Sequence, residues 1–283
     1  MEILVERCLA GGRSSVVESA DGGRISSHVA GDGPTVVIAH GYLDEHANFC
    51  AIANRLVASG RRVVLFDQRC HGASTPGRDG VSTPAMAADY AAVLEHHDVR
   101  GGVLVGHSMG GFLATAFALR HRDVAAERLR GLVLASTHAG DVTRRSIQNR
   151  VQIKLIEAGG MRLLARSKAA TRLMARTLFG EMARQEWLTM AAEQVLRHDF
   201  RQTLPILRAM VDESYYGRLN DVPIPAMVVC GDRDRTCPPH HSEELGARIR
   251  GARNVWLPGV GHMVHFEKPA AIVDAAEAML QVS

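Results

Sequence analysis

The stretch Gly106-His107-Ser108-Met109-Gly110 places a serine between a predicted strand and a predicted helix. Residues 102–105 before it are apolar and β-branched, as in a buried strand, and residues 111–119 after it are typical of a buried helix. A serine on so sharp a strand-to-helix turn needs a strained backbone, and side chains on the two flanking glycines would collide with the neighbouring element. We therefore interpret Ser108 as a nucleophile held on a tight turn, the alternative being an ordinary glycine-rich junction.

Two later segments place an acid and a base at the ends of predicted strands. The buried-strand pattern of residues 225–230 runs into Gly231-Asp232-Arg233-Asp234, and that of residues 254–257 runs into Pro258-Gly259-Val260-Gly261-His262. Open α/β sheets bind their ligands at the carboxyl ends of the strands, so these side chains are expected near the serine. A histidine there would take the serine proton, and an aspartate would orient that histidine.

In their order of serine, acid and histidine, these segments resemble the α/β-hydrolase superfamily, and more closely its esterase, lipase and carbon–carbon hydrolase branch. In that family the acid stands three residues after the glycine that ends the strand. The resemblance therefore implies Asp234 as the acid and leaves Asp232 as a turn residue. It likewise favours His262, which follows the Gly-x-Gly turn, over His265 in the lead into the final helix.

The resemblance also implies an oxyanion hole, the pair of donors that bind the charge developing on a carbonyl oxygen. One donor would be the backbone N–H of Met109, at the start of a helix whose dipole favours negative charge. The segment Ala39-His40-Gly41-Tyr42 resembles the family's His-Gly-x segment, which implies the N–H of Tyr42 as the second donor. His40 and Gly41 would shape that turn. The residues expected to support the serine turn itself are Gly106, His107 and Gly110.

The alternation of apolar strands with helices predicts a mostly parallel sheet with helices on both faces, and the resemblance implies the α/β-hydrolase fold with eight strands. Residues 1–137 begin with a hairpin that turns at Asp21-Gly22-Gly23, and residues 220–283 return to strand and helix. Together these two segments form the expected core domain. Residues 138–219 contain helical patterns alone, and the resemblance implies a cap inserted between strands 6 and 7 that covers the active site.

The expected elements follow from the apolar periodicity and from turn residues. Strands are predicted at 15–19, 24–30, 35–39, 62–67, 102–106 and 131–136, with helices at 47–58, 84–97 and 109–121. In the cap, helices are predicted at 147–158, 161–165, 171–179, 186–197 and 203–211. Thr83 is the expected N-cap of the helix that begins at Pro84. Asp67 and Arg69 are interpreted as turn-fixing groups, and the family usually has glycine where Cys70 stands.

The predicted cap is basic, with fourteen Arg or Lys against eight Asp or Glu in residues 141–220. We interpret this charge as a solvated helical face in an arginine-rich protein. The alternative is an amphipathic lid that attracts an anionic or amphiphilic ester, or a membrane surface. The pairs His96-His97 and His240-His241 are interpreted as exposed and structural.

The charge and hydrophobicity of the sequence argue against nucleic-acid binding and against a membrane span. The formal net charge of +3 is too small to indicate nucleic-acid binding, and no apolar run reaches the roughly 20 residues of a membrane span. The first residues lack the pattern of a signal peptide, so a cytoplasmic location is expected. The five cysteines have no metal-ligand spacing, and no metal or organic cofactor is expected. A weak homo-oligomer is compatible with the sequence.

The resemblance implies a serine hydrolase that cleaves a small-molecule carboxylic ester through an acyl-enzyme. Three alternatives stay open: a carbon–carbon bond hydrolase, a cofactor-free perhydrolase or haloperoxidase on the same triad, and a small-molecule receptor on the same fold. Epoxide and haloalkane hydrolysis are disfavoured, because those branches have aspartate where Ser108 stands.

Overall fold

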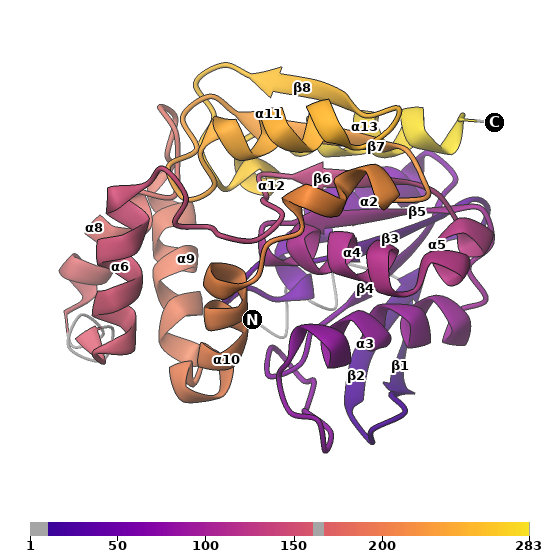
Figure 1. The fold of residues 1–283 in the computed structure, drawn as a ribbon, viewed down its shortest axis with the longest axis horizontal. Coiled ribbons are helices and arrows are strands. Elements are labelled where there is room, and N and C mark those ends of the chain that lie inside the picture. The colour runs from indigo at the N-terminus through magenta and orange to yellow at the C-terminus, as the bar shows by residue number, and fades with distance from the viewer. Residues whose placement is uncertain (1–10, 161–166, 283) are drawn as a thin grey trace.

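A single eight-stranded sheet forms the centre of the protein, in a computed structural model that describes residues 11–160 and 167–282 (Figure 1). Its strands are β1 (Arg13–Glu18), β2 (Arg24–Ala30), β3 (Thr35–Ala39), β4 (Arg62–Phe66), β5 (Gly102–His107), β6 (Leu129–Ala135), β7 (Ala226–Gly231) and β8 (Arg253–Leu257). They lie in the order β1-β2-β4-β3-β5-β6-β7-β8. β2 is antiparallel to β1 and β4, and every other neighbouring pair is parallel. The predicted α/β-hydrolase fold is confirmed.

Helices cover both faces of the sheet, and the strands present alternate residues to each face. In β3, Val37 and Ala39 belong to one core cluster, whereas Val36 and Ile38 belong to the other. The first cluster includes residues of α3 (Thr83–His96), α4 (Met109–Arg120), α5 (Arg122–Arg128) and α11 (Pro239–Arg248). The second includes residues of α2 (Cys50–Ala58) and α13 (Pro269–Leu280). Strands buried on both sides explain the nearly continuous apolar runs in the sequence.

A group of helices between β6 and β7 stands at one end of the sheet (Figure 1). Its members are α6 (Ile147–Glu157), α8 (Lys168–Arg176), α9 (Gln185–Arg197) and α10 (Phe200–Asp212). The chain then passes through a short 3-10 helix, η2 (Tyr216–Asp221), into β7. The helix expected at 161–165 lies outside the described residues. All four of these helices share a cavity with the loops that follow β3 and β5.

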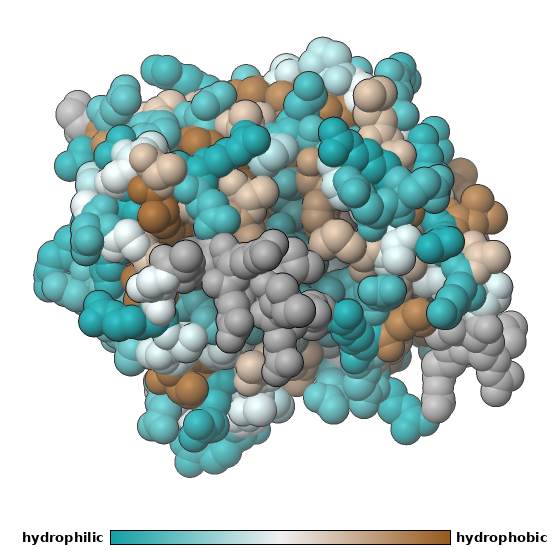
Figure 2. All heavy atoms as spheres, turned by 180° about the vertical axis from the view of Figure 1, so that it is seen from behind, coloured by the Kyte–Doolittle hydropathy of each residue, from teal (hydrophilic) through white to brown (hydrophobic). Residues whose placement is uncertain are grey.

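Within the described residues, all five large apolar side chains that are at least half exposed lie on the segment from α6 to α10. They are Ile147, Val151, Leu155, Leu173 and Met182. On the face shown in Figure 2, hydrophobic residues are scattered among hydrophilic ones. No helix in the described part of the chain is both long and apolar enough to cross a bilayer.

Two local predictions are wrong. The N-cap of α3 is Ser82, whose hydroxyl accepts the N–H of Ala85, so the helix begins one residue before Pro84. His97 and His241 are buried, although His96 is exposed as expected. The His97 ring is hydrogen-bonded to the Ser27 hydroxyl of β2, and the His241 ring to the Tyr216 hydroxyl of η2. Both partners come from distant parts of the chain, and a helical pattern does not reveal them.

A buried ion cluster ties the first hairpin to the sheet. Arg69, on the loop after β4, is 1% exposed and donates to Asp21 of the hairpin turn at 2.6 Å and to Asp89 of α3 at 2.5 Å. Asp67, at the start of the same loop, accepts the N–H groups of His46 and Ala73. Cys70 adopts a left-handed conformation with φ of 60°, which is the reason that glycine suits this position. The turn-fixing interpretation of Asp67 and Arg69 agrees with these contacts.

We predict that Arg69→Met lowers the free energy of unfolding by about 3–5 kcal/mol, because it leaves two buried carboxylates without their cation. Urea unfolding followed by circular dichroism measures the change. Arg61→Met is the matched control, because Arg61 pairs with Glu277 nearer the surface and such pairs contribute about 1 kcal/mol or less. Equal losses in the two variants would contradict the importance of the buried cluster.

Candidate active site

Ser108 sits on a strained turn between β5 and α4. Its backbone has φ of 52° and ψ of −120°, a conformation that L-residues rarely adopt. Two hydrogen bonds hold the turn: the Ser108 N–H donates to the Ala135 carbonyl at 3.0 Å, and the Thr137 hydroxyl donates to the Ser108 carbonyl at 2.6 Å. The end of β6 therefore fixes the strained residue in place.

The two glycines that flank Ser108 have no room for a side chain. A Cβ atom on Gly106 would lie 2.6 Å from the Gly110 carbonyl oxygen. A Cβ atom on Gly110 would lie 2.4 Å from the carbonyl oxygen of Ala39, the last residue of β3. These contacts are with backbone atoms that cannot rotate away, so the turn can approach β3 only with glycine at both positions.

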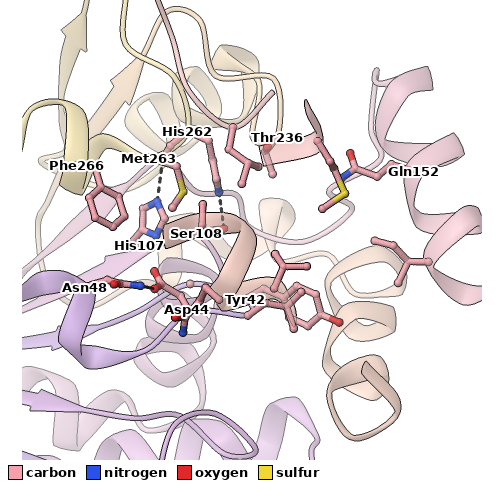
Figure 3. Close-up of a pocket in the computed structure, with 18 of the residues that line it drawn as sticks. Tyr42, Asp44, Asn48, His107, Ser108, Gln152, Thr236, His262, Met263 and Phe266 are labelled. Carbon is pink, nitrogen blue, oxygen red and sulfur yellow. Dashed lines mark hydrogen bonds between the residues drawn. The ribbon is translucent and has the colours of Figure 1, made fainter. Parts of the chain in front are cut away.

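Ser108, His262 and Asp234 form a hydrogen-bonded chain, although they come from three different loops. Figure 3 shows the bond between Ser108 and His262. His262 Nε2 lies 3.0 Å from the Ser108 Oγ, and His262 Nδ1 lies 3.0 Å from an Asp234 carboxylate oxygen. Since a carboxylate accepts, Nδ1 carries the ring proton, and Nε2 presents its lone pair to the serine hydroxyl. Asp234 is itself oriented by the N–H groups of Thr236 and Cys237.

The two competing residues lie elsewhere. Asp232 is exposed, and its carboxylate accepts the N–H of Gly259 at 2.8 Å, as a loop residue does. His265 is 1% exposed and stacks on Phe49, with ring centroids 4.5 Å apart and planes 12° apart. Neither residue touches Ser108 through a hydrogen bond within the described residues.

The expected oxyanion donors lie on the loop after β3 and at the first residue of α4. Neither the Tyr42 N–H nor the Met109 N–H donates a hydrogen bond to another described residue. A Cβ on Gly41 would lie 3.3 Å from the Ser108 Cβ, which shows how closely this loop approaches the serine. His40 shapes the loop: its Nδ1 is 2.8 Å from the Gly41 carbonyl oxygen, and its Nε2 accepts the Gln68 N–H. Burial lowers the pKa of His40 to about 4, so the ring is neutral.

A cavity of about 140 Å³ opens beside Ser108 and His262 (Figure 3). Most of its lining is apolar and comes from α6, from α8 and the turn after it, from α9 and α10, and from residues 263–266. The apolar lining residues are Ile156, Met174, Leu178, Ala191, Val195, Phe200, Met263 and Phe266. The Tyr42 side chain also lines the cavity, and its hydroxyl is 3.0 Å from the Thr203 hydroxyl of α10.

Sequence reasoning missed five polar residues of this cavity, which are Asp44, Asn48, Gln152, Gln194 and Thr236. Asp44 Oδ2 and Gln194 Nε2 are buried and have no hydrogen-bond partner among the described residues. Asp44 could have been predicted from its position three residues after Gly41, because the loop that follows β3 faces the site. Nothing in the sequence of α9 distinguishes Gln194 from a surface residue.

Known proteins resemble this chain in sequence and in structure. A family model described as alpha/beta hydrolase fold matches residues 34–269. The mouse "sn-1-specific diacylglycerol lipase ABHD11" is 29% identical over 252 residues, which cover 87% of this chain and 81% of that protein. The "Putative non-heme bromoperoxidase BpoC" of Mycobacterium tuberculosis is 29% identical over 224 residues, 76% of this chain and 81% of that protein.

Among solved structures, the esterase EaEST from Exiguobacterium antarcticum superposes with a TM-score of 0.83 at 20% identity, covering 95% of this chain and 100% of its own. That likeness bears on the fold. The family model spans most of the chain and therefore shows the family to which the chain belongs. The chain belongs to the α/β-hydrolase fold family, and it is a hydrolase of that family.

Proposed function

We propose that the protein is a serine hydrolase that cleaves carboxylic esters through an acyl-enzyme on Ser108. The observation that carries the proposal is the chain from Ser108 Oγ through His262 to Asp234, with both bonds at 3.0 Å and with the serine at the wall of an apolar cavity. The relative named as a diacylglycerol lipase supports the same reaction class.

In the acylation step, Ser108 Oγ attacks the ester carbonyl while His262 Nε2 takes the hydroxyl proton. The carbonyl oxygen gains negative charge, and the N–H groups of Tyr42 and Met109 donate to it. Asp234 accepts from His262 Nδ1 and stabilises the imidazolium. His262 then gives its proton to the alcohol oxygen as the ester C–O bond breaks.

The deacylation step repeats this sequence with water. His262 takes a proton from the water, whose oxygen attacks the acyl carbonyl, and the same two N–H groups bind the oxyanion. The bond to Ser108 Oγ breaks as His262 returns the proton to it, and a carboxylic acid leaves. We assign residues 138–219 the role of a cap, because α6, α8 and α9 supply much of the cavity lining.

The similarity to a relative named as a bromoperoxidase favours a second candidate. In a perhydrolase, hydrogen peroxide replaces water in the attack on the acyl-enzyme, and a peracid leaves in place of the acid. The triad and the oxyanion donors have the same roles in both reactions, so the choice depends on which nucleophile enters the cavity.

We predict that Ser108→Ala lowers kcat/KM for p-nitrophenyl esters by about 10⁴-fold or more, since loss of the nucleophile leaves only binding and oxyanion stabilisation. The measurement is a series of esters from acetate to palmitate with both proteins. Wild type should prefer the shorter acyl chains, because a cavity of about 140 Å³ is small beside the ~300 Å³ or more of drug-sized sites.

Circular dichroism controls for the folding of the Ser108→Ala variant. Ester turnover that survives the substitution would refute the assignment of the nucleophile. Bromide oxidation that depends on peroxide and acetate, and that outpaces ester cleavage, would select the perhydrolase.

Asp234→Asn and Asp232→Asn form a matched pair, because the two aspartates lie two residues apart and only Asp234 contacts His262. We expect Asp234→Asn to lower kcat by about 10⁴-fold, since an amide in that place favours the wrong histidine tautomer. Asp232→Asn should stay within about threefold of wild type, the scale of a surface change of ~0.5 kcal/mol. The assignment fails if Asp232→Asn is the more damaging of the two.

A further inference from the structure

Three buried side chains near Ser108 bring together nitrogen and oxygen atoms that have no hydrogen-bond partner among the described residues. Asp44 follows β3, His107 ends β5 and His265 belongs to the short helix α12 (Val264–Glu267). One donor atom from each lies within 4.8 Å of the other two. Asp44 Oδ2, His107 Nδ1 and both ring nitrogens of His265 have no hydrogen-bond partner among the described residues. All three residues are at most 5% exposed.

Unsatisfied polar atoms in a buried position are costly, at about 1–3 kcal/mol each. The proposed ester hydrolysis uses none of these three side chains. Two of them, Asp44 and His107, also line the cavity, so a small ion has a route to them (Figure 3).

We propose that Asp44, His107 and His265 bind a divalent transition-metal ion such as Zn²⁺, with a fourth coordination position open to the cavity. Two imidazole nitrogens and one carboxylate oxygen form a donor set that zinc accepts in proteins. The three residues are 63 and 158 positions apart along the chain, so they form no local metal-binding motif, and no metal is expected from the sequence.

The protonation of His107 fits the role of a ligand. Its Nε2 lies 2.9 Å from the His262 carbonyl oxygen, which can only accept, so Nε2 carries the proton and Nδ1 presents a lone pair. A metal-bound histidine usually donates its other N–H in this way to a carbonyl or carboxylate. Burial, with a contribution from His262, lowers the pKa of His107 to about 3, so the ring is neutral as a ligand must be.

The other two ligands are also oriented by their surroundings. Asp44 Oδ1 accepts from the Asn48 amide at 2.5 Å and from the Glu45 N–H at 2.9 Å, which leaves Oδ2 to face His265. Stacking on Phe49 holds the His265 ring. Asp44 Oδ2 and His265 Nε2 are 3.5 Å apart, close to the ~3.3 Å between donors of a tetrahedral site with bonds of about 2.0–2.1 Å.

Such an ion would join the three segments that carry the site. The loop of Asp44 includes Tyr42, His107 precedes Ser108, and His265 follows His262 by three residues. We therefore expect the ion to stabilise the fold, and we expect this effect independently of ester turnover.

The test is metal binding by the full chain after dialysis against a chelator. Titration with Zn²⁺ in a calorimeter should give one ion per chain, Co²⁺ should give the visible bands of a tetrahedral site, and Zn²⁺ should raise Tm. Asp44→Asn keeps the side-chain shape and removes the charge. It should weaken Zn²⁺ binding by more than about tenfold, the least that even an outer-shell change costs.

His265→Phe, which keeps the stacking on Phe49, should weaken binding in the same way. His96→Gln removes an exposed histidine and is the matched control, with wild-type binding expected. Comparing Tm in the metal-free state shows whether each variant still folds. The proposal is overturned if wild type binds no Zn²⁺ at stoichiometric level, or if folded Asp44→Asn and His265→Phe bind it as wild type does. Failure of this test leaves the proposed hydrolysis untouched, because that proposal rests on Ser108 turnover.

Discussion

The contact between the Ser108 turn and the end of β3 is the constraint on which the site depends. Gly110 lies where any Cβ would meet the Ala39 carbonyl oxygen at 2.4 Å, and Gly106 lies against the turn itself. This approach brings the first residue of α4 beside the loop that carries Tyr42. The proposed oxyanion donors, the strained serine and the core packing of α4 thus depend on one close contact. The strain is offset by the packing of α4, which is buried along nearly all of its length.

Buried polar groups fix the loops around that contact. His40 joins the loop after β3 to the loop after β4 through Gln68, and Arg69 of the second loop reaches the hairpin and α3. Neutral histidines suit this role, since each can donate at one ring nitrogen and accept at the other without the cost of a buried charge. The loops at the carboxyl edge of the sheet are therefore held by side-chain bonds where no strand pairing is available.

Local patterns predicted much of this arrangement. Apolar strands alternate with helices along the chain, so short segments of sequence are enough to predict the sheet and the serine turn. Ser82 and Thr83 are both good N-caps, and only the backbone decides between them. The burial of His241 depends on Tyr216, and the convergence of Asp44, His107 and His265 depends on three loops. These contacts follow from the packing of distant segments, which periodicity does not encode.

The most direct test of the account is covalent labelling of the nucleophile. The protein is treated with a fluorophosphonate that mimics an ester, and the labelled residue is identified by mass spectrometry of peptides. Because His262 and the two backbone donors should activate a single serine, the account predicts one adduct per chain, on Ser108. An unlabelled folded protein, or an adduct on a different serine, would contradict it.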